Sequence, residues 1–357
     1  MKKISIIVLL ALVSFSSNAG NIDRAGTAGA QQLLINPWAR SSGLGNTSSS
    51  FITGIEASYF NIAGLAHTRS TEVIFSRMNY VAGISSNSIG FSQKMGSGSS
   101  GVLGLSINTF NSGEIIRTTV EQPDGGLGTY SVQFLDLGLS YAKKFSEQIS
   151  GGLMAKVISQ GTADAKASGL AIDAGVQYRT SLNKNKKIKG QDFKIGISVR
   201  NIGPDISFRG DALSVRAIPD GGSYSSTVEQ RSDGDNLPSL VNMAAAYDFR
   251  LDGNKDSYFH RLTVAANFTS HSFSADQSGL GLEYSYKDLL MFRGAFVYED
   301  GIFGDRTVRN TFFTGYNFGA SFQIPFGTNK STFAIDYSYR TTDLLGGVHT
   351  FGGRINL

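Results

Sequence analysis

The stretch LAIDAGVQYR, residues 170–179, decides the fold. Apolar or aromatic side chains occupy every second position, namely Leu170, Ile172, Ala174, Val176 and Tyr178, and alternate with Ala171, Asp173, Gly175, Gln177 and Arg179. A repeat of two residues is that of a β-strand whose two faces meet different surroundings. Strands of soluble proteins usually have about five or six residues, whereas a strand that crosses a bilayer needs about nine to eleven. The stretch therefore predicts a membrane-crossing strand.

The same alternation recurs along most of the chain after residue 70. It is clear at 135–141, 193–200, 280–287 and 333–339, and it is less regular in the first, second and fifth of the predicted strands. The sequence predicts fourteen strands, at about 71–80, 85–95, 100–110, 130–144, 147–159, 167–181, 192–201, 239–250, 258–269, 277–287, 289–298, 315–325, 331–340 and 349–357.

The lengths of the connections give a second indication of the fold. Connections after odd-numbered strands hold more than three times as many residues as those after even-numbered strands. This sorting is typical of bacterial outer-membrane barrels, which have long loops outside and short turns in the periplasm. Lipid offers the backbone no hydrogen bonds, so the sheet has to close on itself. We expect an all-β protein: a fourteen-stranded antiparallel outer-membrane β-barrel over residues 71–357.

The first 19 residues have the pattern of a secretory signal peptide. Lys2 and Lys3 precede an apolar run at 4–15, and small residues lead to Ser17-Asn18-Ala19. The apolar run is shorter than the roughly 20 residues that a membrane-spanning helix needs. The sequence therefore predicts an exported protein whose residues 1–19 are removed.

Composition and motifs argue against several function classes. The chain has no Cys, which excludes a cysteine nucleophile and a disulfide framework. Its formal net charge of +4 is too small to indicate a nucleic-acid partner. The four His, at 67, 260, 271 and 349, lack metal-ligand spacing. We expect no enzyme activity, no cofactor and no metal site.

Charged residues fall on the less apolar face of the predicted strands, which a barrel turns toward its lumen. The lumen-facing candidates are Asp136, Asp173, Lys194, Arg200, Arg261, Glu283, Arg293, Asp336 and Arg354. They either satisfy one another inside the lumen or form a substrate site, and the first interpretation is favoured because buried charges are normally paired.

Two short elements precede the first strand. Ala39-Arg40-Ser-Ser-Gly43-Leu-Gly45 matches an A-R-x-x-G-x-G pattern, and Asn61-Ile62-Ala63-Gly64-Leu65 matches N-P-A-G-L except that Ile62 replaces Pro. Together with the strand pairs at 137–160, 193–203 and 281–296, they resemble the PorV/PorQ family within the FadL-like outer-membrane barrels. The resemblance covers nearly the whole exported chain.

The resemblance implies fourteen strands and an N-terminal segment, residues 20–70, that folds into the lumen as a plug. The plug motif comprises Ala39, Arg40, Gly43, Gly45, Asn61, Ala63, Gly64 and Leu65. Proline presets φ, so its replacement by Ile62 is expected to loosen the turn after Asn61. A gating plug and a plain filler of the lumen both remain open.

The resemblance to PorV implies an accessory of the type IX secretion system, which binds a translocon subunit or secreted cargo at the outer membrane. The long connection at 202–238 would then be an extracellular docking loop. Its charged residues are Arg209, Asp211, Arg216, Asp220, Glu229, Arg231, Asp233 and Asp235.

The alternative is a FadL-like transporter of hydrophobic small molecules such as long-chain fatty acids. That function needs an apolar pocket and a lateral gap in the wall. The inward faces are mostly small, polar or charged, which favours the protein-binding interpretation. A structural outer-membrane protein without transport is a third possibility, and all three have membrane lipid as a partner.

Overall fold

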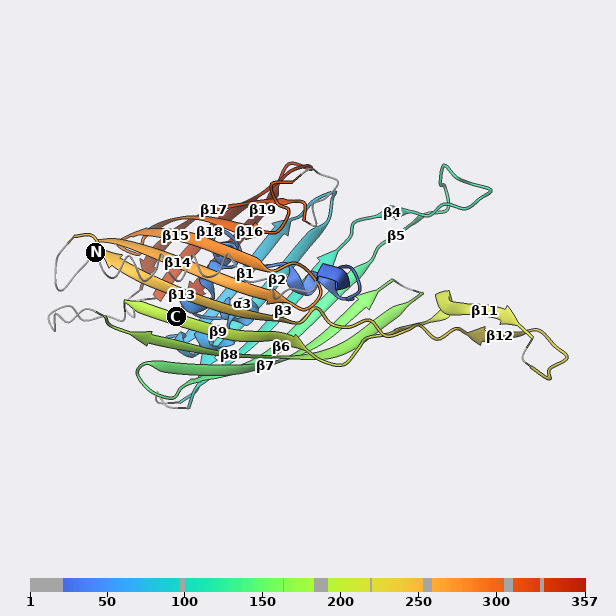
Figure 1. Cartoon of the computed structure of the whole chain (residues 1–357), viewed down its shortest axis with the longest axis horizontal. Coiled ribbons are helices and arrows are strands. Elements are labelled where there is room, and N and C mark those ends of the chain that lie inside the picture. Colours follow the sequence, from blue (N-terminus) through green and yellow to red (C-terminus); the bar gives the residue numbers. More distant parts are fainter. Residues whose placement is uncertain are drawn as a thin grey trace.

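The protein is described by a computed structural model covering residues 22–96, 100–162, 164–182, 192–218, 220–252, 259–304, 311–327 and 331–357. The predicted signal peptide, residues 1–19, lies outside the described residues. Figure 1 shows a barrel of long strands, with two thin hairpins that extend from one end.

Fourteen long strands in the described residues build the barrel wall and confirm the predicted fold. Their bounds agree with the predicted ones to within three residues. They are β1 (Thr71–Asn79), β2 (Ser85–Lys94), β3 (Val102–Asn111), β6 (Gln133–Lys144), β7 (Ile149–Gly161), β8 (Lys166–Thr180), β9 (Phe193–Ile202), β13 (Leu240–Arg250), β14 (His260–His271), β15 (Gln277–Tyr286), β16 (Leu290–Glu299), β17 (Phe313–Phe326), β18 (Ser331–Thr342) and β19 (Val348–Asn356).

Each wall strand pairs antiparallel with its neighbours in chain order. The first strand β1 also pairs with the last strand β19, from Glu72 opposite Asn356 to Asn79 opposite His349. The pairing of β8 with β9 completes the ring. A closed ring leaves no wall strand with an unpaired edge facing lipid.

The outer face of the wall is apolar over its central band. Exposed outward side chains include Phe75, Leu139, Leu170, Leu282 and Phe318. The inward positions between them are small, polar or charged, as the strict burial alternation of β1 illustrates. This arrangement is that of a barrel whose outer band lies in the acyl region of a bilayer. No helix in the described part of the chain is long and apolar enough to span a membrane.

The N-terminal segment (residues 22–70) lies inside the barrel, where its helices are drawn in blue in Figure 1. It contains α2 (Ala39–Ser42), α3 (Ala57–Phe60) and the 3-10 helices η1 (Ile22–Arg24), η2 (Gln31–Leu34), η3 (Thr47–Ser50) and η4 (Ile62–His67). Helix η4 packs on β6, β7 and β8, η3 packs on β9, β13 and β14, and α2 packs on β17, β18 and β19. The segment thus contacts the wall on all sides.

A shared apolar core joins the segment to the wall. Trp38, Ile55 and Leu65 from the segment are fully buried and pack with Ile74 of β1 and Met154 of β7. Inward apolar side chains of this kind interrupt the hydropathy alternation. They account for the irregular pattern of the first and fifth predicted strands.

Short strands lie outside the ring at the end where the two longest connections emerge. β4 (Ile115–Ile116) pairs with β5 (Thr129–Tyr130), and β11 (Ser214–Ala217) pairs with β12 (Ser226–Glu229). β10 (Phe208–Arg209) adds to β8, and the 3-10 helix η5 (Asp211–Leu213) follows it. Figure 1 shows both hairpins projecting well beyond the barrel, opposite the end where the C-terminus lies.

Candidate functional site

Hydrogen bonds from side chains to backbone carbonyls join the N-terminal segment and β8 in both directions. The Nδ2 of Asn61 donates to the carbonyl oxygen of Val176 at 3.1 Å, and the Nε2 of Gln177 donates to that of Ser49 at 3.0 Å. Hydrogen bonds that pair an otherwise buried carbonyl are costly to lose, so these contacts fix the depth of the segment.

The eight plug-motif residues are all at packed positions of this segment. Ala39 and Arg40 are in α2, and Gly43 follows it. Asn61 precedes η4, and its side chain accepts a hydrogen bond from the N–H of Ala63 at 3.2 Å. The remaining motif residues are buried, namely Gly45, Gly64 and Leu65. Ile62, at the position of the family's Pro, is buried in the shared core.

All nine predicted lumen charges lie on inward positions, and most of them are paired. In the largest group, the carboxylate of Glu283 accepts a hydrogen bond from the Nε of Arg293 at 2.7 Å, and it lies 3.5 Å from the guanidinium of Arg261. Arg354 and Asp336 are 3.9 Å apart. This pairing favours the interpretation in which the charges satisfy one another.

Two carboxylates connect that group to the N-terminal segment. Glu72 of β1 accepts a hydrogen bond from the N–H of Ile55 at 2.8 Å. Glu56 is fully buried, and neither oxygen of its carboxylate has a hydrogen-bond partner in the described residues. Burial raises the pKa of Glu56 to about 7, against the opposing influence of Arg40 and Arg354.

Two smaller charge groups lie elsewhere in the lumen. Lys156 and Asp173 form a buried ion pair at 2.8 Å on the β7–β8 wall. Lys194 of β9 pairs with Asp248 at 2.6 Å. Arg200 differs from these, because within the described chain it forms no ion pair.

A cavity of about 630 Å³ lies above the segment, toward the hairpin end of the barrel. Aromatic rings from four wall regions and from the segment line it: Tyr59, Phe60, Tyr80, Phe110, Phe134, Phe312 and Phe313. Its size is in the range of about 300–1,000 Å³ that is usual for small-molecule sites.

Two guanidinium groups face this cavity from different strands. Arg200 of β9 lies over the Tyr59 ring, with its Cζ 4.0 Å from the ring centre, and Arg340 of β18 lies over Phe313 at 3.8 Å. Neither makes an ion pair with any described residue. Glu299 is the one acidic residue among the described lining, and it accepts a hydrogen bond from Gln277 at 2.7 Å. The polar part of the cavity is therefore suited to an anion.

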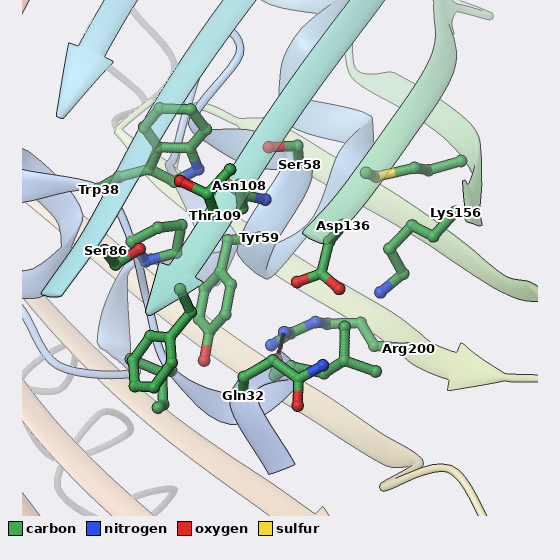
Figure 2. Close-up of a pocket in the computed structure, with 15 residues that line it drawn as sticks. Gln32, Trp38, Ser58, Tyr59, Ser86, Asn108, Thr109, Asp136, Lys156 and Arg200 are labelled. Atoms are coloured by element: carbon green, nitrogen blue, oxygen red, sulfur yellow. Dashed lines mark hydrogen bonds between the residues drawn. The ribbon is translucent and has the colours of Figure 1, made fainter. Parts of the chain in front are cut away.

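A side pocket of about 40 Å³ adjoins the cavity and shares Gln32, Tyr59, Phe110 and Arg200 with it. In Figure 2 the carboxylate of Asp136 points into this pocket toward Lys156 and Arg200. Several polar atoms around it lack a partner among the described residues: both amide atoms of Gln32, Oδ1 of Asn108, Oδ1 of Asp136 and Nε1 of Trp38. The pocket has room for a few water molecules or a small polar group.

The sequence-based reasoning identified the inward charges but missed the aromatic lining. Phe134 is out of phase with the outward Leu135 and Leu137, so its parity already indicates an inward side chain. Phe110 alternates in the same way with Thr109. No local signal indicates that Phe312 and Tyr80 reach the same cavity.

The predicted docking residues do not form one surface. Arg216 and Glu229 belong to the projecting β11–β12 hairpin, whereas Arg209 lies in β10 against β8. Asp235 is at the base of the loop, where it forms a bridge with Ile206. The others, Asp211, Asp220, Arg231 and Asp233, are exposed along the loop.

Comparison with known proteins gives matches at the level of structure. No protein-family model matches the sequence, and no curated protein matches it. The Ralstonia pickettii toluene transporter TbuX has 13% identity and a TM-score of 0.54, with 90% of this chain and 97% of that chain covered. The Pseudomonas putida toluene transporter TodX has 10% identity and the same TM-score and coverage.

A third match is the monoaromatic hydrocarbon channel CymD, with 11% identity, a TM-score of 0.50, and 90% of this chain and 97% of that chain covered. At these identities the likeness concerns the fold. It supports the FadL-like part of the resemblance and gives no support specific to PorV/PorQ or type IX secretion. The chain has the fold of a FadL-like outer-membrane β-barrel.

Proposed function

We propose that this barrel takes up small amphipathic molecules from outside the cell, and that the cavity above the N-terminal segment is their binding site. The observation that carries the proposal is the cavity itself. It combines seven aromatic rings with two guanidinium groups that have no acidic partner in the described chain. Two proteins of similar fold, TbuX and TodX, are toluene transporters, which agrees with an aromatic or aliphatic body for the ligand.

The two kinds of lining residue act on different parts of one ligand. Burial of apolar surface against the rings contributes roughly 25 cal/mol per Å² removed from water. A carboxylate head would accept hydrogen bonds from Arg200 or Arg340, and such charge-assisted bonds contribute about 1.5–3 kcal/mol. Long-chain fatty acids and aromatic carboxylates both combine an apolar body with a carboxylate head.

The N-terminal segment closes the route below the cavity in this proposal. Gln177 of β8 donates to the backbone carbonyl of Ser49, Asn61 of the segment donates to that of Val176, and the segment shares its apolar core with the wall. Passage of a ligand would therefore require part of the segment to move. Residues 20–70 would then act as a plug.

Binding of a matched ligand pair tests the proposal. Toluene and 4-methylbenzoate differ by one carboxylate, and both can be titrated against the protein in lipid nanodiscs. Trp38, the single tryptophan, lines the side pocket and reports binding by its fluorescence. We expect Arg200→Gln or Arg340→Gln to weaken 4-methylbenzoate binding about tenfold or more, as the loss of a charge-assisted bond implies.

Arg77→Gln is the matched control, because Arg77 points outward from β1. It should leave the affinity for both ligands unchanged. Equal affinity of the wild type for toluene and 4-methylbenzoate would remove the role proposed for the guanidinium groups. Absence of binding of either molecule, and of dodecanoate, would overturn the whole proposal.

A second candidate function is the binding of a type IX translocon subunit or secreted cargo. The projecting β11–β12 hairpin favours it, because an isolated two-stranded ribbon is only marginally stable in water without further contacts. Affinity purification from outer membranes, with residues 210–232 deleted as the comparison, tests this function. A stoichiometric protein that is lost on deletion would support it, and its absence from both samples would count against it.

A further inference from the structure

The extracellular loop (residues 203–238) begins and ends at one buried ion pair. Asp173, paired with Lys156, accepts a hydrogen bond from the N–H of Asn201 at 2.7 Å. The Nδ2 of Asn201 donates to the carbonyl oxygen of Pro238 at 3.0 Å. Asn201 has a φ of 58°, in the left-handed region, near the end of β9, where the chain leaves the wall. Both ends of the loop are therefore fixed to the same point of the barrel.

Just above that point, the two arms of the loop bind each other. The N–H of Ile206 donates to the carbonyl oxygen of Asp235 at 2.9 Å, and the N–H of Asp235 donates back to that of Ile206 at 2.7 Å. The side-chain amide of Asn236 donates to the carboxylate of Asp205. The β11–β12 hairpin thus stands on a closed base.

The first described part of the N-terminal segment is attached to this base. Ala28 forms a parallel bridge with Asn236, in which the N–H of Gly29 donates to the carbonyl oxygen of Asn236 at 3.0 Å. The Nη2 of Arg24 donates to Oδ1 of Asn236 at 2.7 Å. We call these contacts, between residues 24–29 and 235–236, the clasp.

Apolar packing reinforces the clasp from inside the barrel. Ile206 and Leu237 of the loop are buried against Ala30 and Leu33 of the segment. Wall residues Ile158 and Ala171 complete the cluster. An extracellular loop that buries apolar side chains against a lumenal segment cannot move without exposing them, and each large side chain contributes about 1.5–3 kcal/mol by its burial.

The same stretch of the segment continues directly into the cavity wall. Gln31, Gln32 and Leu34 line the cavity, and the carbonyl oxygen of Leu33 accepts a hydrogen bond from Nη2 of Arg200 at 3.2 Å. Ala30, the residue that directly follows the clasp, lines the cavity as well. A displacement of the clasp therefore reaches Arg200 and the mouth of the side pocket within a few residues.

We propose that the extracellular loop and residues 24–34 move as one unit, so that a displacement of the β11–β12 hairpin changes the shape of the cavity through the clasp. The coupling is reciprocal, since a ligand that shifts residues 31–34 must also displace the loop. The coupling goes beyond the proposed function and does not depend on which molecule the cavity takes.

The test uses an epitope inserted between Gly221 and Gly222 at the hairpin tip, with its Fab fragment as the bound macromolecule. Because the chain has no cysteine, Gln32→Cys provides a unique thiol at a buried position of the cavity wall. Its rate of reaction with a membrane-impermeant maleimide is measured with and without Fab. We expect Fab to change the rate about fivefold or more, the lower end of usual allosteric couplings.

Ser42→Cys is the matched control. Ser42 lines the same cavity and is also buried, but it lies in α2, away from the clasp. Fab should leave its rate unchanged. No change at Gln32→Cys, or an equal change at both positions, would overturn the proposal.

Two variants break the clasp in different ways. Gly29→Val places a Cβ 2.8 Å from the Cβ of Asp235 and forces the two segments apart. Arg24→Ala removes only side-chain contacts, namely the hydrogen bond to Asn236 and the stacking of the guanidinium over the Phe273 ring at 4.1 Å. The Fab effect should disappear in the first and weaken in the second. Heat-dependent mobility on gels verifies that each barrel has folded, and a full Fab effect in folded Gly29→Val would refute transmission through the clasp.

Discussion

Gly43 of the N-terminal segment and Gly319 of β17 meet so closely that a Cβ on Gly43 would lie 2.7 Å from the Cα of Gly319. The contact is between two backbones, so neither side can yield by rotating a side chain. It sets the distance between α2 and the wall. Similar small residues face the segment elsewhere, as at Gly352 against Ala39.

Gly319→Val is therefore expected to push α2 away from the wall. Overpacking of a close contact costs about 1–3 kcal/mol. The emission of Trp38, which is fully buried at the start of α2, should shift to longer wavelength. Gly294→Val on the neighbouring strand is the control, because nothing lies within 4 Å of its added Cβ. An equal shift in both variants would contradict the role of the contact.

The packing of the N-terminal segment should depend on pH through Glu56. Burial raises the pKa of Glu56 from 4.5 to about 7, while Arg40 and Arg354 oppose the shift and Asp336 and Glu72 add to it. A carboxyl group whose pKa is raised on folding binds its proton more tightly in the folded state. The contribution of Glu56 to the free energy of unfolding is complete below pH 4.5, and it is lost as the pH rises through about 7.

Chemical denaturation followed by Trp38 fluorescence measures this dependence between pH 5 and 8. Relative to Glu56→Gln, the wild-type segment should become less stable as the pH rises toward 7. The difference in stability between the two proteins isolates the contribution of Glu56. His67 acts in the opposite direction, because burial lowers its pKa to about 2, and its contribution remains in both proteins. An unchanged slope in Glu56→Gln would show that another group is responsible.

Removing one partner of the Glu283–Arg293 ion pair should cost more stability than replacing both partners by apolar residues. Both side chains are almost fully buried, and their atoms are 2.7 Å apart. Removing one partner leaves an unpaired buried charge, which costs about 3–5 kcal/mol. We expect Glu283→Gln to lower the free energy of unfolding by that amount, whereas the double variant Glu283→Leu/Arg293→Met loses less. Urea unfolding in lipid vesicles measures both, and a double variant that loses more than Glu283→Gln would contradict this expectation.

A charge on the outer band should destabilise the barrel according to its depth. Leu139 is central in β6 and 62% exposed on the outer face, while Thr109 is outward near the hairpin end of β3. Arginine at the bilayer midplane costs about 2–4 kcal/mol, and near the interface about 0–1. Leu139→Arg should therefore slow or prevent assembly into vesicles, and Thr109→Arg should assemble normally. Equal assembly of the two variants would mean that the band does not lie at the midplane.

The sequence by itself determined the wall of this protein. In a strand, neighbouring side chains point to opposite faces, so the alternation at 170–179 fixes which residues meet lipid without any knowledge of the rest of the chain. Lipid then requires closure of the sheet, and the sorted loop lengths indicate the direction of each strand. The inward positions of Asp173 and Glu283 followed from the same local rule.

Only the tertiary structure decided what fills the lumen. Ile74 and Met154 face inward against the rule because the N-terminal segment offers them an apolar surface. The cavity needs the ring to close, since Phe110 and Phe313 come from strands that are far apart in the chain. Arg200 forms no ion pair with a described residue for the same reason, because its surroundings are made by the segment and not by its own strand. Contacts between distant parts of the chain depend on packing in three dimensions, and no local periodicity encodes them.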